Sequence, residues 1–214
     1  SVAENEVLKS AENVSKALAS RGWNAGVLEL LRPISRAAAV LESLPRGTAV
    51  FNLFEGYPDD TESEVEVGLL LKSLGLRATG CPPETMFLSL HKSLCNQVLA
   101  ARGFPTLPHR LLSRPGDLDR DLPFPFPVFL KAAASDASHG VDRDSLATDR
   151  PTFEAKATTM LARFPGGVLV EPFLPGREIY CGVGEVAGAP EPLPPTLIDY
   201  SALPPDYPPV LTFE

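Results

Sequence analysis

Hydrophobic positions in the first part of the chain follow two alternating patterns. Apolar residues recur every three to four positions in some segments, as in a helix, and form short continuous runs in others, as in a buried strand. In chain order these patterns predict a helix at 4–20, a strand at 26–31, a helix at 33–44, a strand at 48–54 and a helix at 61–74. Alternating strands and helices favour parallel pairing with right-handed crossovers. The sequence therefore predicts a small Rossmann-like α/β domain over residues 1–85.

The order of predicted elements changes after this domain. One long helix is expected at 84–102, followed by strands at 109–112 and 127–132, a helix at 152–163, and strands at 168–173 and 178–186. This order predicts an α+β unit over residues 86–188. Prolines are frequent in residues 189–214, so that segment is expected to be extended. It is either a constrained surface connection or a ligand for a proline-reading domain.

Two of the predicted strands end in ionisable residues of opposite sign, Lys131 and Glu171. Burying a charge is costly unless the charge has a partner. A nucleotide would satisfy both strand ends, because Lys131 can meet phosphate oxygens and Glu171 can accept from the exocyclic amine of a base. The backbone of Leu174 would then face the same edge of the base, and Glu178 would accept from ribose hydroxyls. The alternative is two ordinary strands with solvated ends.

The net charge and the cysteine spacing limit the partners and the cellular compartment that the sequence is expected to have. The formal net charge of −8 argues against a nucleic-acid or anionic-membrane partner, which needs a basic face. The longest apolar runs are too short to span a bilayer. Cys81, Cys95 and Cys181 show no CxxC spacing, which indicates reduced thiols and a cytoplasmic location. Cys95 and Cys181 are expected to be small buried residues in a helix and a strand.

Five segments carry a more specific signal in their order along the chain. They are Phe51-Asn-Leu-Phe-Glu-Gly56, Leu74-Gly-Leu-Arg-Ala-Thr-Gly80, the helix and turn from His91 to Pro105, the strand ending at Lys131, and the segment from Val168 to Glu178. Together they resemble the ATP-grasp superfamily and, within it, the D-alanine–D-alanine ligase-like group. The resemblance implies a pre-ATP-grasp domain followed by an ATP-grasp lid subdomain. It also implies an ATP- and Mg²⁺-dependent ligase that activates a carboxylate as an acyl phosphate before an amine attacks.

The resemblance assigns roles to particular residues. Lys92 and Lys131 match the two lysines that contact the nucleotide, and Glu171 matches the acceptor for the adenine amine. The remaining residues of the adenine and ribose segment are Phe173, Leu174 and Glu178. Glu4 matches the carboxylate that holds the amino group of the first substrate, and the alternative is a helix-start acid favoured by the helix dipole.

The loop after Lys131 departs from the family pattern. Asp136 and Ala137 replace a glycine and a serine, which leaves Ser138 and Gly140 to close over the phosphates. This departure leaves the specificity for D-alanine open. The acidic run at 59–66 is either a cation site or, as we favour, a solvated loop leading into a helix.

The resemblance also implies that family members extend beyond both ends of this chain. A strand is expected ahead of Glu4, and residues 189–214 are expected to begin a C-terminal catalytic subdomain. The Mg²⁺ ligands are expected beyond residue 214, so we expect no metal ligand within the chain and no complete ligation by the chain alone. The expected substrate is a small amino acid or other carboxylate, and a homodimer is left open. The alternatives are a nucleotide-binding module without ligase activity and a carboxylate-binding or scaffold protein.

Overall fold

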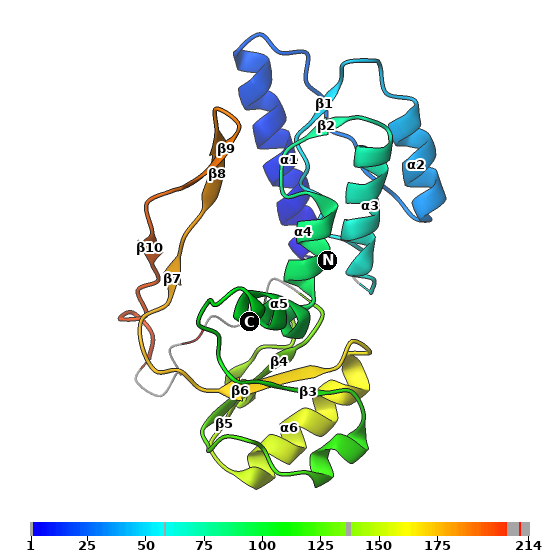
Figure 1. The fold of residues 1–214 in the computed structure, drawn as a ribbon. Helices are drawn as coiled ribbons and strands as arrows, with labels where there is room; N and C mark the ends of the chain where they lie inside the picture. Colours follow the sequence, from blue (N-terminus) through cyan, green and yellow to red (C-terminus); the bar gives the residue numbers. More distant parts are fainter. Residues whose placement is uncertain (1, 58, 136–137, 205–209, 211–214) are drawn as a thin grey trace. The chain divides into compact units, whose positions relative to one another are not determined.

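The chain forms two compact units, Ser1–Leu90 and His91–Glu214, each with its own core (Figure 1). A computed structural model describes the backbone of residues 2–57, 59–135, 138–204 and 210, with side chains from residue 6 onward in those ranges. Within these ranges, no helix is both long and apolar enough to cross a lipid bilayer.

The first unit is mainly helical. Its helices are α1 (Val2–Ser20), α2 (Ile34–Glu42), α3 (Glu62–Ser73) and α4 (Pro83–Leu90), and its strands are β1 (Ala49–Val50) and β2 (Arg77–Ala78). The two strands pair in parallel with α3 between them in the chain, but β2 is not among the strands that the sequence pattern predicts. Leu41, Val67 and Leu71 form the centre of the core.

The predicted strand at 26–31 is wrong for the described structure. Residues 23–31 have no regular secondary structure, and Val27, Leu28 and Leu31 are exposed. The predicted strand at 48–54 is reduced to the two residues of β1. An apolar run indicates burial, but a strand also needs a neighbour that supplies ladder hydrogen bonds. Among the described strands, β2 is the one that pairs with β1, and none pairs with residues 26–31.

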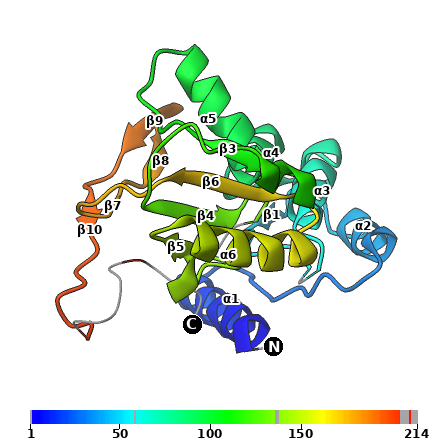
Figure 2. The ribbon, with the colours of Figure 1, turned by 90° about the horizontal axis from the view of Figure 1, so that it is seen from below.

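The second unit is built on a four-stranded antiparallel sheet. Its strands are β3 (Arg110–Leu112), β4 (Val128–Ala132), β5 (Leu146–Ala147) and β6 (Val168–Pro172), in the spatial order β3-β6-β4-β5. Figure 2 shows β6 between β3 and β4, although β6 follows both in the chain. The helices α5 (Lys92–Ala101) and α6 (Arg150–Arg163) belong to the same unit. The strands agree with the sequence prediction except for β5, which the sequence analysis missed.

The two faces of this sheet have different characters. Side chains that alternate along β4 and β6, including Val128, Leu130 and Val170, are fully buried in a core with Phe153 and Met160 of α6. Because successive side chains of a strand point to opposite faces, Lys131 and Glu171 lie on the other face of the sheet. The apolar face therefore anchors α6 and leaves the charged residues for the opposite side.

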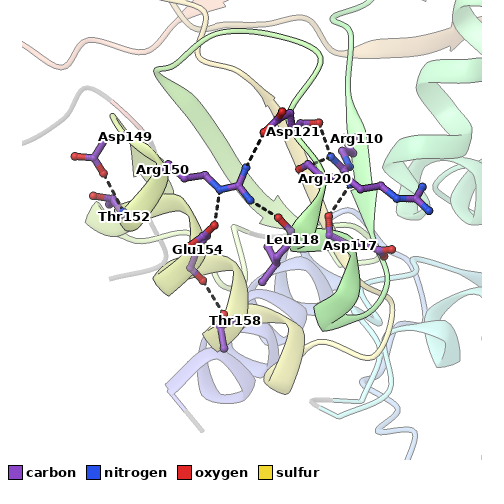
Figure 3. A network of polar contacts seen from close by, with 10 residues as sticks. All are labelled: Arg110, Asp117, Leu118, Arg120, Asp121, Asp149, Arg150, Thr152, Glu154 and Thr158. Atoms are coloured by element: carbon purple, nitrogen blue, oxygen red, sulfur yellow. Dashed lines mark hydrogen bonds and ion pairs between the residues drawn. The ribbon is translucent and has the colours of Figure 1, made fainter.

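Two arginines hold the connection between β3 and β4 (Figure 3). This connection contains a short 3₁₀ helix at Pro115–Asp119. The guanidinium of Arg110 donates to three backbone carbonyls at 2.6–2.9 Å, those of Asp117, Arg120 and Asp121. Arg150 of α6 donates to the carbonyl of Leu118 and forms ion pairs with Asp121 and Glu154. These contacts satisfy loop carbonyls that lack strand or helix partners.

A long β-hairpin follows β6. It consists of β7 (Ile179–Tyr180) and β8 (Val183–Val186) paired with β10 (Thr196–Leu197) and β9 (Ala189–Pro192), respectively. The single strand predicted at 178–186 is thus two strands, and the proline-rich segment supplies their partners. Ala187 and Gly188 both have positive φ, as a two-residue hairpin turn requires. Cys181 is exposed between β7 and β8, so the expectation that it is buried is wrong.

The long helix predicted at 84–102 is divided at His91. Helix α4 ends at Leu90, and α5 begins at Lys92. His91 has φ −87° and ψ 80°, outside the helical region. A β-bridge joins His91 to Ala134, and the Lys92 N–H donates to the carbonyl of Ala133 at 3.1 Å. Hydrogen bonds to a distant segment thus override a locally helical pattern.

Candidate functional site

The side chains of Lys131 on β4 and Glu171 on β6 meet on the sheet face opposite α6, although the two strands are antiparallel. In the register of the two strands, Phe129 pairs with Glu171 and Lys131 pairs with Leu169, so Lys131 and Glu171 are diagonal neighbours. Lys131 Nζ lies 2.5 Å from Glu171 Oε2. The Glu171 side chain is 9% exposed and that of Lys131 is 30% exposed. A nearly buried carboxylate is therefore compensated by a cation that still reaches solvent.

A third side chain completes this arrangement. Asn96, on α5, donates from Nδ2 to Glu171 Oε1 at 3.1 Å. Each oxygen of Glu171 therefore has a donor, one from α5 and one from β4. The sequence analysis missed Asn96. Its position four residues after Lys92 on the same helix was the available signal, because residues at this spacing share a helix face.

Further polar contacts connect α5 to the start of β3. Ser93 Oγ lies 3.0 Å from His109 Nε2, and Gln97 Nε2 lies 3.3 Å from Ser93 Oγ. Arg110 pairs with Val170, so His109 precedes the strand beside the Glu171 end of β6. The Ser93–His109 and Asn96–Glu171 contacts fix the orientation of α5 relative to β3 and β6, whereas the Gln97–Ser93 bond lies within α5.

Lys92 lies at the first position of α5, and its contacts lead to the loop that follows β4. Its Nζ donates to the carbonyl of Ser135, and its backbone N–H donates to Ala133. Residues 136–137 lie outside the described part of the chain. Lys92 is therefore placed at the base of the loop that the sequence predicts to cover phosphates.

The far end of this loop is packed tightly. Ser138 and Gly140 have φ values of 58° and 78°. Phe164 is the residue that follows α6, and a Cβ added at Gly140 would lie 2.5 Å from its ring. Gly140 thus has a structural reason to be glycine, and its predicted part in nucleotide binding stays a prediction. Beyond it, Lys156 of α6 pairs with Asp142 at 2.5 Å.

The residues that follow β6 are less closely grouped. The ring of Phe173 lies 6.4 Å from that of Phe129, while Leu174 is exposed. Glu178 accepts a hydrogen bond from the hydroxyl of Tyr200 across the hairpin. Within the described ranges, no hydrogen bond or ion pair joins Glu178 to Lys131 or Glu171. Partial burial and, after it, the charge of Glu178 raise the pKa of the Tyr180 hydroxyl.

Two other predictions concern the first unit. Glu4 lies in the backbone of α1, but its side chain is outside the described residues. In the acidic run, Asp59 pairs with Arg32, whose guanidinium also lies 4.6 Å from the centre of the Tyr57 ring. Neither unit, as far as its residues are described, contains three or more His, Cys, Asp or Glu side chains grouped to hold a metal ion. The described residues therefore do not fit a magnesium site.

The donors and acceptors of the second unit can serve a ligand with both an anionic and a basic end. An ammonium group has three donor hydrogens, and each carboxylate oxygen accepts more than one hydrogen bond. Lys131 and Glu171 therefore keep bonding capacity beyond their mutual contact. Lys131 suits phosphate oxygens, and Glu171 suits an amine.

No family model matches the chain. Among curated proteins, the D-alanine–D-alanine ligase of Oleidesulfovibrio alaskensis is 30% identical over 192 residues, which is 89% of this chain and 58% of the relative. That of Geobacter sulfurreducens is 31% identical over 183 residues, 85% of this chain and 54% of the relative. The chain therefore spans somewhat more than half the length of these relatives.

Solved structures of such ligases share the fold. D-alanine–D-alanine ligase from Helicobacter pylori has a TM-score of 0.59 at 20% identity, over 78% of this chain and 52% of that one. L-amino acid ligase from Bacillus licheniformis has a TM-score of 0.61 at 19% identity, over 78% of this chain and 40% of that one. The similarity in sequence extends over most of the chain, and the fold agrees with it. The chain is therefore similar to D-alanine–D-alanine ligases over most of its own length and over somewhat more than half of theirs.

Proposed function

We propose that this chain supplies nucleotide-binding residues of an ATP-dependent ligase that joins a carboxylate to an amine through an acyl phosphate. The observation that supports this most directly is the contact between Lys131 and Glu171 on one face of the sheet. It brings a cation and a carboxylate acceptor together as diagonal neighbours on two paired strands. The alternative of two solvated strand ends does not explain why the Glu171 carboxylate is only 9% exposed.

Each nucleotide part has a proposed partner in the second unit. Lys131 and Lys92 contact phosphate oxygens as point charges. Glu171 accepts from the exocyclic amine of adenine, and the backbone of Leu174 faces the same edge of the ring. Glu178 accepts from the ribose, replacing its bond with Tyr200. Phe173, Ser138 and Gly140 complete the proposed set, the last two through the loop after β4.

The chemistry that these residues support is positioning and charge stabilisation. Phosphoryl transfer places negative charge on the transferring group, and fixed cations lower the energy of that state. The two lysines would contribute this effect at the phosphates. Magnesium supplies further neutralisation when bound, but the described residues do not fit a magnesium site, so we assign no step to the metal here.

We propose an amino acid as the carboxylate substrate, with Glu4 holding its amino group. Of the four similar proteins reported above, three are named as D-alanine–D-alanine ligases and one as an L-amino acid ligase. These names support the substrate class and leave the configuration of the amino acid open.

Calorimetric titration with ATP tests the nucleotide assignment. Lys131→Ala is expected to weaken ATP binding by about tenfold to a hundredfold, the value of one charge-assisted hydrogen bond. Lys72→Ala is a matched control, because Lys72 also pairs with a glutamate, Glu84, but lies on α3 of the first unit. Glu4→Ala is expected to leave ATP affinity unchanged. Equal ATP affinities for the Lys131 and Lys72 variants would refute the assignment.

A further inference from the structure

We infer that Asn96 is a positioning residue that sets the preference of Glu171 for adenine over bases with a carbonyl at the same place. This inference rests on the proposed function, and it assigns a role to a residue of the His91–Pro105 segment for which the resemblance gives none. Its starting point is the hydrogen bond from Asn96 Nδ2 to Glu171 Oε1 at 3.1 Å.

The two donors to Glu171 act from different elements. Lys131, on β4, holds Oε2 at 2.5 Å, and Asn96, on α5, holds Oε1. A carboxylate held at both oxygens cannot rotate freely about its last side-chain bond. Without the Asn96 donor, both oxygens can turn toward the ammonium group of Lys131, because that group offers several donor hydrogens. Asn96 therefore keeps one oxygen of the Glu171 carboxylate from turning toward Lys131.

The orientation of α5 makes this constraint rigid. The helix is attached at its first turn by Lys92, which bonds Ser135, and by Ser93, which contacts His109 at 3.0 Å. Asn96 follows on the next turn of the same helix. A side chain on an element anchored in this way holds its partner with little freedom, as positioning requires.

A fixed Glu171 carboxylate discriminates between bases by its chemistry. An ionised carboxylate only accepts hydrogen bonds. It therefore favours adenine, which presents an exocyclic amine, and disfavours hypoxanthine, which presents a carbonyl oxygen at that position. A carboxylate free to rotate can turn away from the carbonyl, so discrimination falls when Asn96 is removed.

The test compares the affinities of ATP and inosine triphosphate, measured by calorimetry, across variants of the full chain. Asn96→Ala is expected to weaken ATP binding by about threefold to tenfold, the effect of one hydrogen bond, with a smaller change for inosine triphosphate. The ratio of the two affinities therefore falls. Asn96→Asp is expected to lower the ratio further, because an isosteric acceptor replaces the donor and adds a like charge. Arg102→Ala, at the exposed C-terminal cap of the same helix, is the control, and its ratio is expected to match that of the unsubstituted chain.

The ratio separates positioning from general stability, because both ligands meet the same folded population of each variant. Unchanged ratios in both Asn96 variants would overturn the inference while leaving the proposed function intact, provided that Lys131→Ala still weakens ATP binding. A chain that binds no ATP, or whose affinity does not respond to Lys131→Ala, overturns the proposed function and this inference together.

Discussion

Replacing Lys131 by Met tests whether Glu171 depends on its ion pair for stability, independently of any ligand. Methionine keeps the length and apolar stem of lysine but removes the charge. Glu171, which is 9% exposed beside Lys131, would then keep Asn96 as its side-chain donor. Leaving a nearly buried carboxylate without its cation is more costly than losing an exposed ion pair. Because Lys131 is itself 30% exposed and water can partly replace it, we expect a loss of about 2 kcal/mol in unfolding free energy.

The Lys156–Asp142 ion pair provides a control. Its nitrogen–oxygen distance is the same as in the Lys131–Glu171 pair, but here the lysine and not the acid is the buried partner. Lys156 Nζ lies 2.5 Å from the carboxylate of Asp142, and the lysine is 9% exposed whereas the acid is 39% exposed. Lys156→Met removes the buried charge and leaves an acid that water can reach. We therefore expect a loss of less than about 1 kcal/mol, as for exposed pairs.

Urea unfolding followed by far-ultraviolet circular dichroism measures both losses. The double variant Lys131→Met with Glu171→Gln completes the comparison, because glutamine still accepts from Asn96 and carries no charge. We expect the double variant to be more stable than Lys131→Met alone. Equal losses for Lys131→Met and Lys156→Met, or a double variant less stable than Lys131→Met, would refute the reasoning.

Two further predictions concern the loop after β4 and the start of α6. Gly140→Ala is expected to lower the free energy of unfolding in urea by about 2 kcal/mol or more, because the added Cβ meets the Phe164 ring at a residue with positive φ. Gly188 has a similar φ but no atom within 4 Å of an added Cβ, so Gly188→Ala is expected to cost about 1 kcal/mol. Equal losses would show that the ring contact is unimportant. Hydrogen bonds from Thr152, through its side chain and then its backbone, lower the pKa of Asp149. A lowered folded pKa contributes stability above the unfolded pKa that is lost as pH falls through the folded pKa. The melting temperature of Asp149→Ala should therefore be below that of the unsubstituted chain at neutral pH and equal to it in acid, and a pH-independent difference would contradict this.

The sequence was sufficient to predict the elements that local pattern determines. The strands ending in Lys131 and Glu171 and the helix after Asp149 agree with the structure, because each combines an apolar pattern with clear end signals. The strand predicted at 26–31 failed because strand formation depends on a neighbour that local pattern does not reveal. The helix predicted at 84–102 failed because His91 bonds to Ala134, far along the chain.

The candidate site was predictable in its charges but not in its contacts. Opposite charges at two buried strand ends indicated that each needs a partner. That Lys131 and Glu171 are partners of each other follows from the register of β4 against β6, which single-strand patterns do not specify. The spacing of Asn96 from Lys92 places both on one face of α5, but the contact of Asn96 with Glu171 follows from the position of α5 over the strands, which the sequence pattern does not specify.

The position of β6 between β3 and β4 also has a consequence for the order of folding. During synthesis from the N-terminus, β3 and β4 emerge well before β6. Among the described strands, β3 pairs with β6 alone, and β4 pairs with β5 on one edge and needs β6 for the other. The sheet therefore cannot close until Pro172 has left the ribosome, and until then both strands carry open edges prone to association with other chains. The same step brings Glu171 out of water and against Lys131. The nascent chain thus acquires its full sheet and its charged pair together, once β6 has emerged.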